Sequence, residues 1–212
     1  MAKKRVLVLG ATGGTGRQVV EQALRLGHDL TALVRSPQRL TVAAERLRVL
    51  TGSVTDNDQG LAAAVRGQDA VISALGVGKS LKSSGLIARS VPGIVRAMES
   101  QGVRRLILTS AYGVGATWQD VPLLPRIVMR VLFWDLYADK AAGEEVLRRS
   151  GLDWTVVYPV TLTDGPRTDR YRDGERLALH GFPRVSRADV AAFLLSQLDD
   201  NTYLRKGVLI SS

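Results

Sequence analysis

The segment Val6–Arg17, VLVLGATGGTGR, constrains the fold of this chain more than any other feature. A short apolar strand leads directly into Gly10, Gly13 and Gly16, which are spaced three residues apart. In a strand–turn–helix unit the first glycine permits a tight turn, the second lets the backbone approach a phosphate, and the third lets the helix pack against the strand. Free amides at the start of such a helix favour an anion. The segment predicts a dinucleotide pyrophosphate site, and the alternative is a tight turn in a protein that has lost its ligand.

Strand-like and helix-like patterns alternate along the chain, which favours a parallel sheet covered by helices on both faces. The expected strands are Arg5–Gly10, Asp29–Val34, Leu47–Leu50, Ala70–Leu75, Arg105–Thr109, Trp154–Tyr158 and Val208–Ile210. The expected helices are Gly16–Leu26, Gln59–Val65, Ser84–Gln101, Pro125–Ser150 and Arg187–Leu198. We therefore expect a Rossmann-type, doubly wound α/β fold with a mainly parallel sheet of about seven strands, formed by residues 1–212 as a single domain.

Local features refine this pattern. Pro92 lies inside the expected helix Ser84–Gln101, and because proline removes one amide hydrogen bond, that helix should kink or start late. Ser186 followed by Asp189 predicts an N-terminal cap. Residues 112–124 and 160–183 are mostly irregular and follow the ends of expected strands, where open α/β sheets bind ligands. We expect these two segments to form the walls of a substrate pocket.

Composition excludes several classes of site. The chain has 212 residues and no cysteine, so it has no thiolate catalysis, and His28 and His180 are too far apart to suggest a metal site. Its apolar runs fall short of the roughly 20 residues that span a bilayer, and MAKKR leads directly into a strand, so we expect a cytoplasmic protein without a membrane segment. The net charge of +9 comes from scattered basic pairs, which does not favour a nucleic-acid partner.

Arg35, at the end of the second expected strand, indicates which nicotinamide cofactor binds. NAD-selective sites of this type carry a carboxylate there, whereas a guanidinium can hold the 2′-phosphate of NADP(H) through two hydrogen bonds. Ser36 and Arg39 follow closely and add donors. The sequence therefore favours NADP(H), and the alternative is that Arg35 is a surface residue before the turn at Pro37.

Five motifs in this order resemble the atypical short-chain dehydrogenase/reductase family: GATGGTGR, VR after the second strand, GQDAVISALG, RRLILTSA and SGLDWTVVYP. The resemblance covers nearly the whole chain and is nearest to the biliverdin IXβ and flavin reductase branch. It implies an NADPH-dependent enzyme with the cofactor across the carboxyl ends of the strands. The implied contacts are Gly10, Thr12, Gly13, Thr15 and Gly16 at the phosphates, Ser53 and Val54 beside the adenine, Ala74, Leu75 and Gly76 at the nicotinamide ribose, and Pro159, Val160 and Thr161 at the carboxamide. Ser53 replaces the family's usual acidic residue.

The resemblance also implies catalytic residues, with one departure. The broader family uses serine, tyrosine and lysine, with the tyrosine four residues before the lysine. Ser110 matches the serine and Lys140 the lysine, but Leu136 occupies the tyrosine position. Tyr137 is one residue away from that position, so its side chain points about 100° away from it around the helix axis.

This departure favours the flavin-reductase-like branch, in which a conjugated ring accepts the hydride without a tyrosine acid. Lys140 would then bind ribose and phosphate or supply positive charge. The alternatives are that Ser110 only ends a strand and that Lys140 forms a surface salt bridge with Asp139 or Glu144.

We therefore expect an NADPH-dependent oxidoreductase that reduces a planar conjugated acceptor such as a flavin, a quinone or a linear tetrapyrrole. Tyr112, Trp118 and Trp134 are candidate stacking residues, although Trp134 could equally belong to the core or face a partner. The alternatives are an NADP(H)-binding redox sensor without turnover, a carbonyl reductase and a sugar-nucleotide epimerase. We expect a small-molecule partner, and a monomer or weak dimer.

Overall fold

The main sheet of the computed structural model, which describes residues 2–56, 58–78, 83–121, 126 and 133–212, has the strand order β3-β2-β1-β4-β5-β6-β10-β8. Its neighbouring strands run parallel except for β8, which is antiparallel to β10. The strands are β1 (Arg5–Leu9), β2 (Asp29–Val34), β3 (Leu47–Thr51), β4 (Ala70–Ser73), β5 (Arg105–Thr109), β6 (Asp153–Pro159), β8 (Arg172–Gly174) and β10 (Lys206–Ser211). A second, parallel pair joins β7 (Thr161–Thr163) to β9 (Arg184–Ser186).

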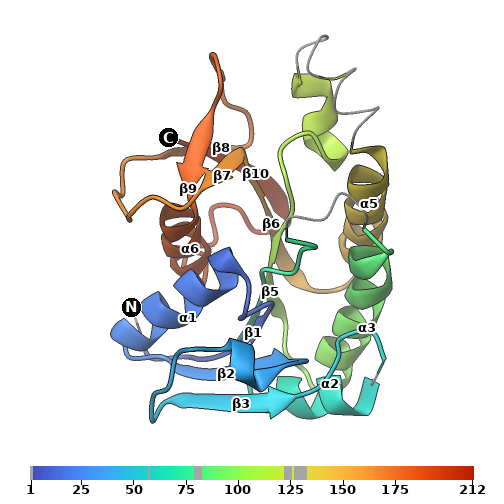
Figure 1. The fold of residues 1–212 in the computed structure, drawn as a ribbon. Coiled ribbons are helices and arrows are strands. Elements are labelled where there is room, and N and C mark those ends of the chain that lie inside the picture. The colour runs from blue at the N-terminus through green and yellow to red at the C-terminus, as the bar shows by residue number, and fades with distance from the viewer. Residues whose placement is uncertain (1, 57, 79–82, 122–125, 127–132) are drawn as a thin grey trace.

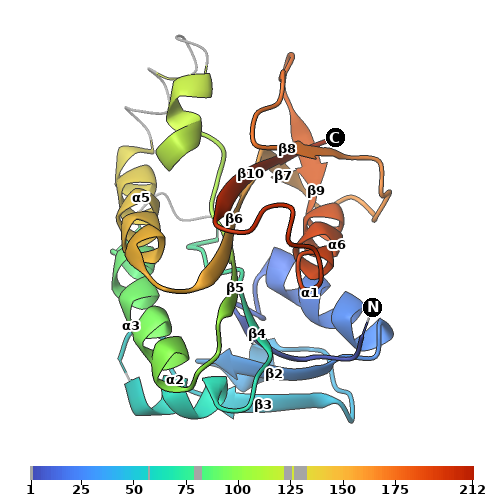
Figure 2. The ribbon, with the colours of Figure 1, turned by 180° about the vertical axis from the view of Figure 1, so that it is seen from behind.

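Helices cover both faces of the main sheet (Figures 1 and 2). One face packs against α1 (Gly14–Arg25) and α6 (Arg187–Ser196), and the other against α2 (Asp58–Val65), α3 (Leu86–Ser100) and α5 (Trp134–Arg149). Alternate strand residues enter the two cores: Val6 and Val8 belong to the first, Leu7 and Leu9 to the second. The doubly wound, mainly parallel Rossmann class is confirmed. Two short 3₁₀ helices, η1 (Pro37–Arg39) and η2 (Gly115–Asp120), lie in the connections.

All seven expected strands are present, and within the described ranges the structure adds three. The additional strands β7, β8 and β9 have three residues each, which is too short for an apolar alternation to be recognised. Of the two expected irregular segments, 160–183 contains β7 and β8, and the described part of 112–124 contains η2. No helix in the described ranges is long and apolar enough to cross a bilayer.

The expected helix Pro125–Ser150 is not continuous, although Arg126 near its expected start is helical. Phe133 has φ −124° and ψ 12°, outside the helical region, so α5 begins at Trp134. Pro125 and residues 127–132 lie outside the described residues. The periodic apolar residues before Phe133 favoured one continuous helix, because no breaker marks the true boundary.

Helix α3 starts later than expected, as Pro92 suggested. Ser84 and Gly85 adopt positive φ values of 53° and 65°, so the helix begins at Leu86 and then continues through the proline. A carboxylate from α5 binds its first turn: Asp139 accepts hydrogen bonds from the amides of Ile87 (3.1 Å) and Ala88 (2.8 Å). The start of α3 is therefore fixed by α5.

The predicted cap of α6 is confirmed. The Ser186 hydroxyl oxygen accepts a 2.9 Å hydrogen bond from the amide of Asp189. The Asp189 carboxylate in turn accepts the amides of Thr168 (2.7 Å) and Asp169 (2.9 Å). Burial alone would raise the pKa of Asp189, but these hydrogen bonds and that from Ser186 outweigh it and lower the pKa. The carboxylate thus ties the loop after β7 to α6.

Candidate functional site

The three glycines after β1 have different structural roles. Gly10 has φ +80°, and a Cβ on it would lie 2.5 Å from the carbonyl oxygen of Ala74. A Cβ on Gly16 would overlap the carbonyl oxygen of Gly10. A Cβ on Gly13, the N-terminal cap of α1, would lie 3.3 Å from that oxygen, a tight contact that a small shift relieves. The fold therefore requires Gly10 and Gly16, whereas Gly13 leaves open the space at the helix start.

That helix start suits an anion. Gly13 has no side chain to bond the first amides of α1, and the first turn contains no acidic residue. Helix starts without a side-chain cap leave amide donors for another acceptor, and the helix dipole favours a negative charge there. The geometry fits a diphosphate at the position that the sequence predicts.

A cavity of about 450 Å³ opens from this turn along the carboxyl edge of the sheet. It is formed where β1, β2, β3 and β4 end and α3 begins. Its lining residues are Gly10, Thr12, Gly13, Leu33, Val34, Arg35, Arg39, Gly52, Ser53, Val54, Thr55, Ala74, Leu75, Gly76, Val77, Gly78, Ser83, Ser84, Leu86 and Arg89. Ten of the predicted cofactor contacts therefore meet in one cavity: Gly10, Thr12, Gly13, Arg35, Arg39, Ser53, Val54, Ala74, Leu75 and Gly76.

The other predicted contacts lie elsewhere. Thr15 and Gly16 are buried in α1, and Ser36 is half-buried between two lining residues. The Pro159 carbonyl accepts the Tyr112 amide (3.0 Å), and the Val160 amide donates to Ile210 (3.3 Å). These two backbone groups are therefore already paired. Thr161 is exposed at the start of β7.

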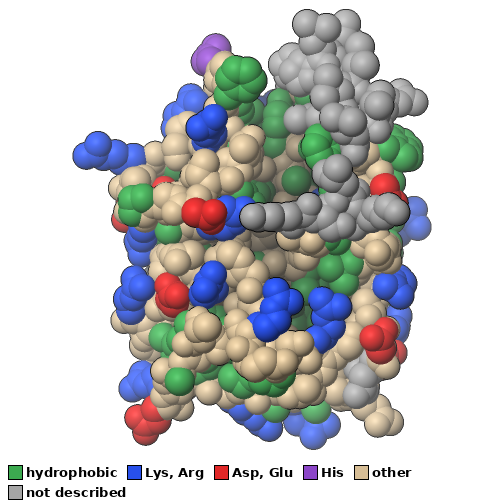
Figure 3. Space-filling model, in the orientation of Figure 1, with side chains coloured by type: hydrophobic (Ala, Val, Ile, Leu, Met, Phe, Trp, Pro, Cys, Tyr) green, Lys and Arg blue, Asp and Glu red, His purple; other side chains and the backbone are tan. Residues whose placement is uncertain are grey.

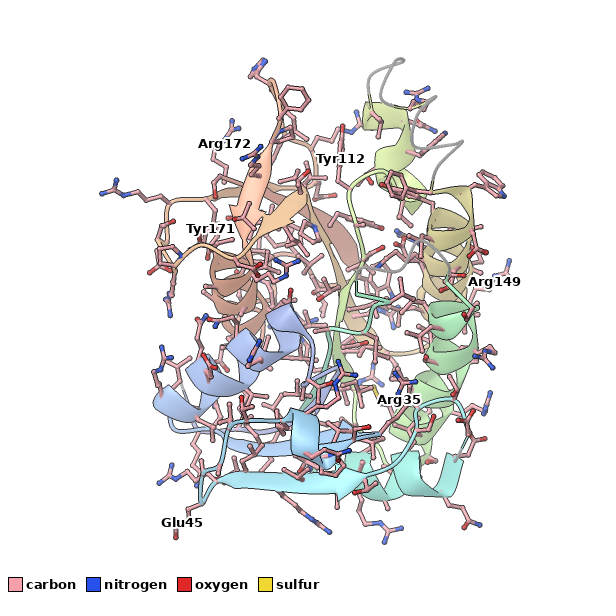
Figure 4. The ribbon with its side chains drawn as sticks, in the orientation of Figure 1. Arg35, Glu45, Tyr112, Arg149, Tyr171 and Arg172 are labelled. Atoms are coloured by element: carbon pink, nitrogen blue, oxygen red, sulfur yellow. The ribbon has the colours of Figure 1, made fainter. Side chains whose placement is uncertain are left out.

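Three arginines line one end of the cavity: Arg35 after β2, Arg39 in η1 and Arg89 in the first turns of α3. We call them the arginine cluster. Figure 4 places Arg35 below the centre of the molecule, and Figure 3 shows basic side chains along the lower edge of the central hollow. No acidic residue is among the described lining residues. Arg89 was not among the expected cofactor contacts, because α3 is far along the chain from the glycine motif.

Ser110 belongs to a polar group that the sequence did not reveal, which we call the Glu144 cluster: the buried Ser110, Glu144 and Tyr158, and the partly exposed Arg148. The Ser110 hydroxyl donates to Glu144 at 2.6 Å, and so does the Tyr158 hydroxyl at 2.6 Å. Arg148 donates to Tyr158 at 2.9 Å and forms an ion pair with Glu144 at 3.4 Å. Burial and Glu144 raise the pKa of Tyr158. The Ser110 proton therefore points toward a carboxylate that is only 2% exposed.

Glycines make room for this cluster. A Cβ on Gly115 would overlap the Glu144 carboxylate, and one on Gly207 would lie 2.5 Å from the Tyr158 ring. Gly143 lets α5 approach α3, because a Cβ there would lie 2.7 Å from the side chain of Ile87. The three glycines thus let neighbouring elements pack closely around the Glu144 carboxylate, a charge that would be costly to bury without partners.

Lys140 is half-buried on α5, one turn before Glu144. It forms no hydrogen bond or salt bridge with any described residue, so the expected surface salt bridge with Asp139 or Glu144 is absent there. Burial lowers the pKa of Lys140, and the nearby charges of Glu144 and Asp139 oppose that shift. Its ammonium group is therefore placed near the Glu144 cluster but is not neutralised by direct contact with described residues.

An aromatic pocket of about 320 Å³ lies between η2 and α5, lined by Gly113, Val114, Gly115, Trp118, Trp134, Tyr137, Ala138 and Ala141. The Tyr137 ring is 6.4 Å from that of Trp118, and the Arg126 guanidinium lies 5.9 Å from the Trp118 ring. Burial, with a contribution from Tyr112, raises the pKa of Tyr137. The pocket brings together Trp118 and Trp134 as expected for a stacking site, and adds Tyr137.

Two buried hydroxyls also lack a partner in the described chain: Ser73 at the end of β4 and Thr109 at the end of β5. Both lie at the carboxyl edge of the sheet, next to the cavity and to Ser110. Buried polar atoms normally have a hydrogen-bond partner. These orphaned hydroxyls and the open glycine turn fit a polar ligand across this edge. Among the described residues, no cluster of His, Asp or Glu could hold a metal ion.

Comparisons with known proteins agree with this geometry. Residues 10–201 match a protein family described as NAD(P)H-binding. The chain is 28% identical over 203 residues to an uncharacterized sugar epimerase of Bacillus subtilis (strain 168), covering 92% of this chain and 88% of that protein. It is 30% identical over 173 residues to an uncharacterized chloroplast protein of Arabidopsis thaliana, covering 78% of this chain. The chain spans 61% of that plant protein.

Solved structures show the same arrangement. The anaerobillin reductase ChuY of Escherichia coli O157:H7 superposes with a TM-score of 0.81 and 25% identity, covering 97% of this chain and 96% of that one. An oxidoreductase of Lactococcus lactis superposes with a TM-score of 0.82 over 97% of this chain and 90% of its own, at 19% identity, a likeness of fold alone.

Proposed function

Because the chain belongs to the NAD(P)H-binding family, we propose that it is an NADPH-dependent reductase of planar conjugated acceptors. One observation carries this proposal: the Ser110 hydroxyl donates its proton to the buried Glu144 at 2.6 Å. A serine that is to polarise a carbonyl has to donate that proton to the substrate. Ser110 is instead placed to accept a hydrogen bond, so the site favours an acceptor that spreads the incoming charge over a ring system.

The residues of the long cavity would hold the cofactor. The amides after Gly13 would bind the diphosphate, Arg35 and Arg39 the 2′-phosphate, and residues 52–55 the adenine. Bound NADPH would supply a hydride, which carries two electrons and one proton, to the acceptor and become NADP⁺, with the second proton coming from solvent.

Tyr137 is poorly suited to act as the acid of a conventional carbonyl reduction. In that chemistry a neighbouring lysine lowers the pKa of the tyrosine, but burial raises the pKa of Tyr137 here. A weaker acid donates its proton less readily at neutral pH. Lys140, whose ammonium makes no direct contact with described carboxylates, would instead stabilise negative charge that develops on the acceptor or bind the cofactor ribose.

The aromatic pocket is the proposed place for the acceptor, with Tyr112 beside it. Its walls are apolar and include Trp118 and Trp134, whose flat faces suit stacking against a conjugated ring. Arg126 already lies over one face of Trp118, so the acceptor would use the remaining surface. The similar E. coli structure is that of an anaerobillin reductase, and we include linear tetrapyrroles among the acceptor classes to test.

The test is NADPH oxidation, followed by absorbance, with a flavin, a quinone, a linear tetrapyrrole and a simple aldehyde as acceptors. We expect turnover with at least one conjugated acceptor and little with the aldehyde. Gly13→Val, which blocks the diphosphate position, is the control for reduction independent of the site. Efficient turnover with the aldehyde alone would contradict the proposal.

The second candidate is a redox sensor that binds NADP(H) without turnover. The raised pKa of Tyr137, which makes it a weaker acid, and the absence of a tyrosine at position 136 both favour it. Tight NADPH binding combined with no turnover on any acceptor would select this function over the reductase.

A further inference from the structure

Arg89 differs from Arg96, the other arginine of α3, in having no salt bridge to an acidic residue in the described chain. Arg96, two turns further along the same helix, forms a 3.1 Å salt bridge with Asp58. Within the described chain, Arg35, Arg39 and Arg89 form no salt bridge at all, although they line the same cavity. Unpaired like charges that face one cavity repel each other unless an anion lies between them. The arginine cluster therefore has more positive charge than the described protein neutralises.

The backbone that supports Arg89 is held in place. Its Nε donates to the carbonyl oxygen of Gly85 at 3.4 Å, and the terminal nitrogens of the guanidinium form no hydrogen bond with described residues. The preceding turn is fixed from α5, because Asp139 accepts the amides of Ile87 and Ala88. Arg89 is thus a basic residue on a rigid helix start, facing a cavity, with most of its donors available.

The nearest acidic group does not neutralise the cluster. The Asp56 carboxylate accepts a 2.7 Å hydrogen bond from the hydroxyl of Thr55. Its pKa is lowered by that bond, by Ser53, and further by the positive charges of Arg89 and Arg35. Both arginines therefore act on the same small region, from two elements that are far apart in the sequence. The exposed Asp56 carboxylate thus interacts with two of the three guanidinium groups.

We propose that Arg89 is a specificity-determining residue that binds the 2′-phosphate of NADPH from the α3 side of the cavity, together with Arg35 and Arg39 on the β2 side. This inference rests on the proposed use of NADPH and adds a residue to it. A phosphate accepts several hydrogen bonds and attracts guanidinium groups from more than one side. Adenine stacking is the competing role, because a guanidinium can also lie flat on an aromatic face.

The test is a set of equilibrium binding titrations, which need no acceptor and no turnover. Arg89→Met removes the charge and keeps most of the side-chain length, and Arg96→Met makes the same change on the same helix outside the cavity. The four ligands are NADPH, NADH, adenosine 2′,5′-bisphosphate and ADP. The two adenosine ligands report on the phosphate position without the nicotinamide.

We expect Arg89→Met to weaken NADPH and adenosine 2′,5′-bisphosphate by about tenfold, the loss of one hydrogen bond to a charged group. NADH and ADP should change by less than about twofold, because they lack the 2′-phosphate. Arg96→Met should bind all four ligands like the original protein, because Arg96 does not line the cavity. The NADPH effect should shrink as salt is added, because screening weakens exposed charge interactions.

Three results would overturn the inference. Equal weakening of all four ligands would assign Arg89 to adenine stacking, and no change in any of them would remove it from the site. If the original protein binds NADPH no better than NADH, the proposed cofactor preference itself fails. If the selective loss is found but no acceptor is reduced, Arg89 keeps this role and the reductase proposal fails instead.

Discussion

The glycine turn after β1 and the Glu144 cluster after β5 lie at the same edge of the sheet, yet they are built differently. The turn is made of backbone, with the cavity beside Gly13 and with exposed arginines nearby that form no salt bridge to described residues. The cluster is made of side chains from α5, β6 and the residue after β5 that are paired with one another, and all of them except the partly exposed Arg148 are buried. The first region is prepared for a ligand from outside, whereas the second satisfies most of its polar groups internally.

This difference separates two kinds of constraint. In the turn, substituting one residue changes either the fold or the ligand space, because each glycine has one role. In the cluster, one carboxylate serves three partners, so a single change alters the hydrogen bonding of all of them. We therefore expect changes on the cofactor side to act mainly on affinity and changes around Ser110 to act on turnover.

The largest effect is expected from the glycines. Gly16→Ala places a Cβ against the Gly10 carbonyl and should destabilise the fold by about 3 kcal/mol, a loss of about 10 °C in Tm for a chain of this size. Gly13→Val should leave Tm nearly unchanged but weaken NADPH binding by more than about 100-fold, because its side chain takes the diphosphate space. Thermal denaturation and a fluorescence titration measure the two quantities. Retained NADPH affinity in Gly13→Val would place the diphosphate elsewhere.

The glycine turn is also the part of the site that the sequence predicts best. Its residues are consecutive, and each glycine follows from a local steric rule. Ten predicted contacts meet in the cavity because parallel strands end at one edge, so a strand assignment places the residue that follows it. Arg89 escaped prediction because its position depends on where α3 starts, and two residues with positive φ move that start to Leu86.

The next effect concerns the choice of cofactor. We expect NADPH to bind at least about tenfold more tightly than NADH, since one hydrogen bond between charged groups contributes about 1.5 to 3 kcal/mol. Arg35→Asp should reverse this order, because a carboxylate repels the 2′-phosphate and accepts the ribose hydroxyls. Arg48→Asp makes the same charge change on β3 outside the cavity and is the control. Equal affinities of the original protein for both cofactors would refute the role of Arg35.

A smaller loss is expected from Ser110→Ala. We expect kcat with a conjugated acceptor to fall by about tenfold, the value of one hydrogen bond, while the affinity for NADPH stays within about twofold. Thr117→Val is a suitable control, because Thr117 lies in the adjacent η2 and its hydroxyl bonds only to backbone in the described chain. Steady-state kinetics with one flavin and one quinone give the measurement. An unchanged kcat would mean that Ser110 serves only to pair with Glu144.

The Glu144 cluster could not be predicted from the sequence, for a physical reason. Glu144 and Arg148 are one turn apart on α5 and resemble an ordinary surface pair in a helical pattern. Only the close packing of α5 on α3, which Gly143 permits, turns this face of the helix toward Ser110 and Tyr158. Burial then changes the chemistry, because the carboxylate becomes an acceptor for hydroxyl groups from two strands. The identity of Ser110 was predictable, but the direction of its proton was not.

The smallest effect is expected from removing the hydroxyl of Tyr137. Its ring lies in the aromatic pocket, so its position does not exclude a role in proton donation, but burial raises its pKa. We expect Tyr137→Phe to change kcat by less than about threefold, whereas loss of a true general acid costs roughly 100-fold to 10,000-fold. The kcat of the original protein should likewise show no basic limb from Tyr137 below its raised pKa. Tyr112→Phe, measured alongside, tests the other hydroxyl near the pocket. A loss in the general-acid range for Tyr137→Phe alone would restore conventional serine–tyrosine–lysine chemistry despite the one-residue shift before Lys140. In that case the Ser110 hydroxyl would have to turn from Glu144 to the acceptor when the acceptor binds.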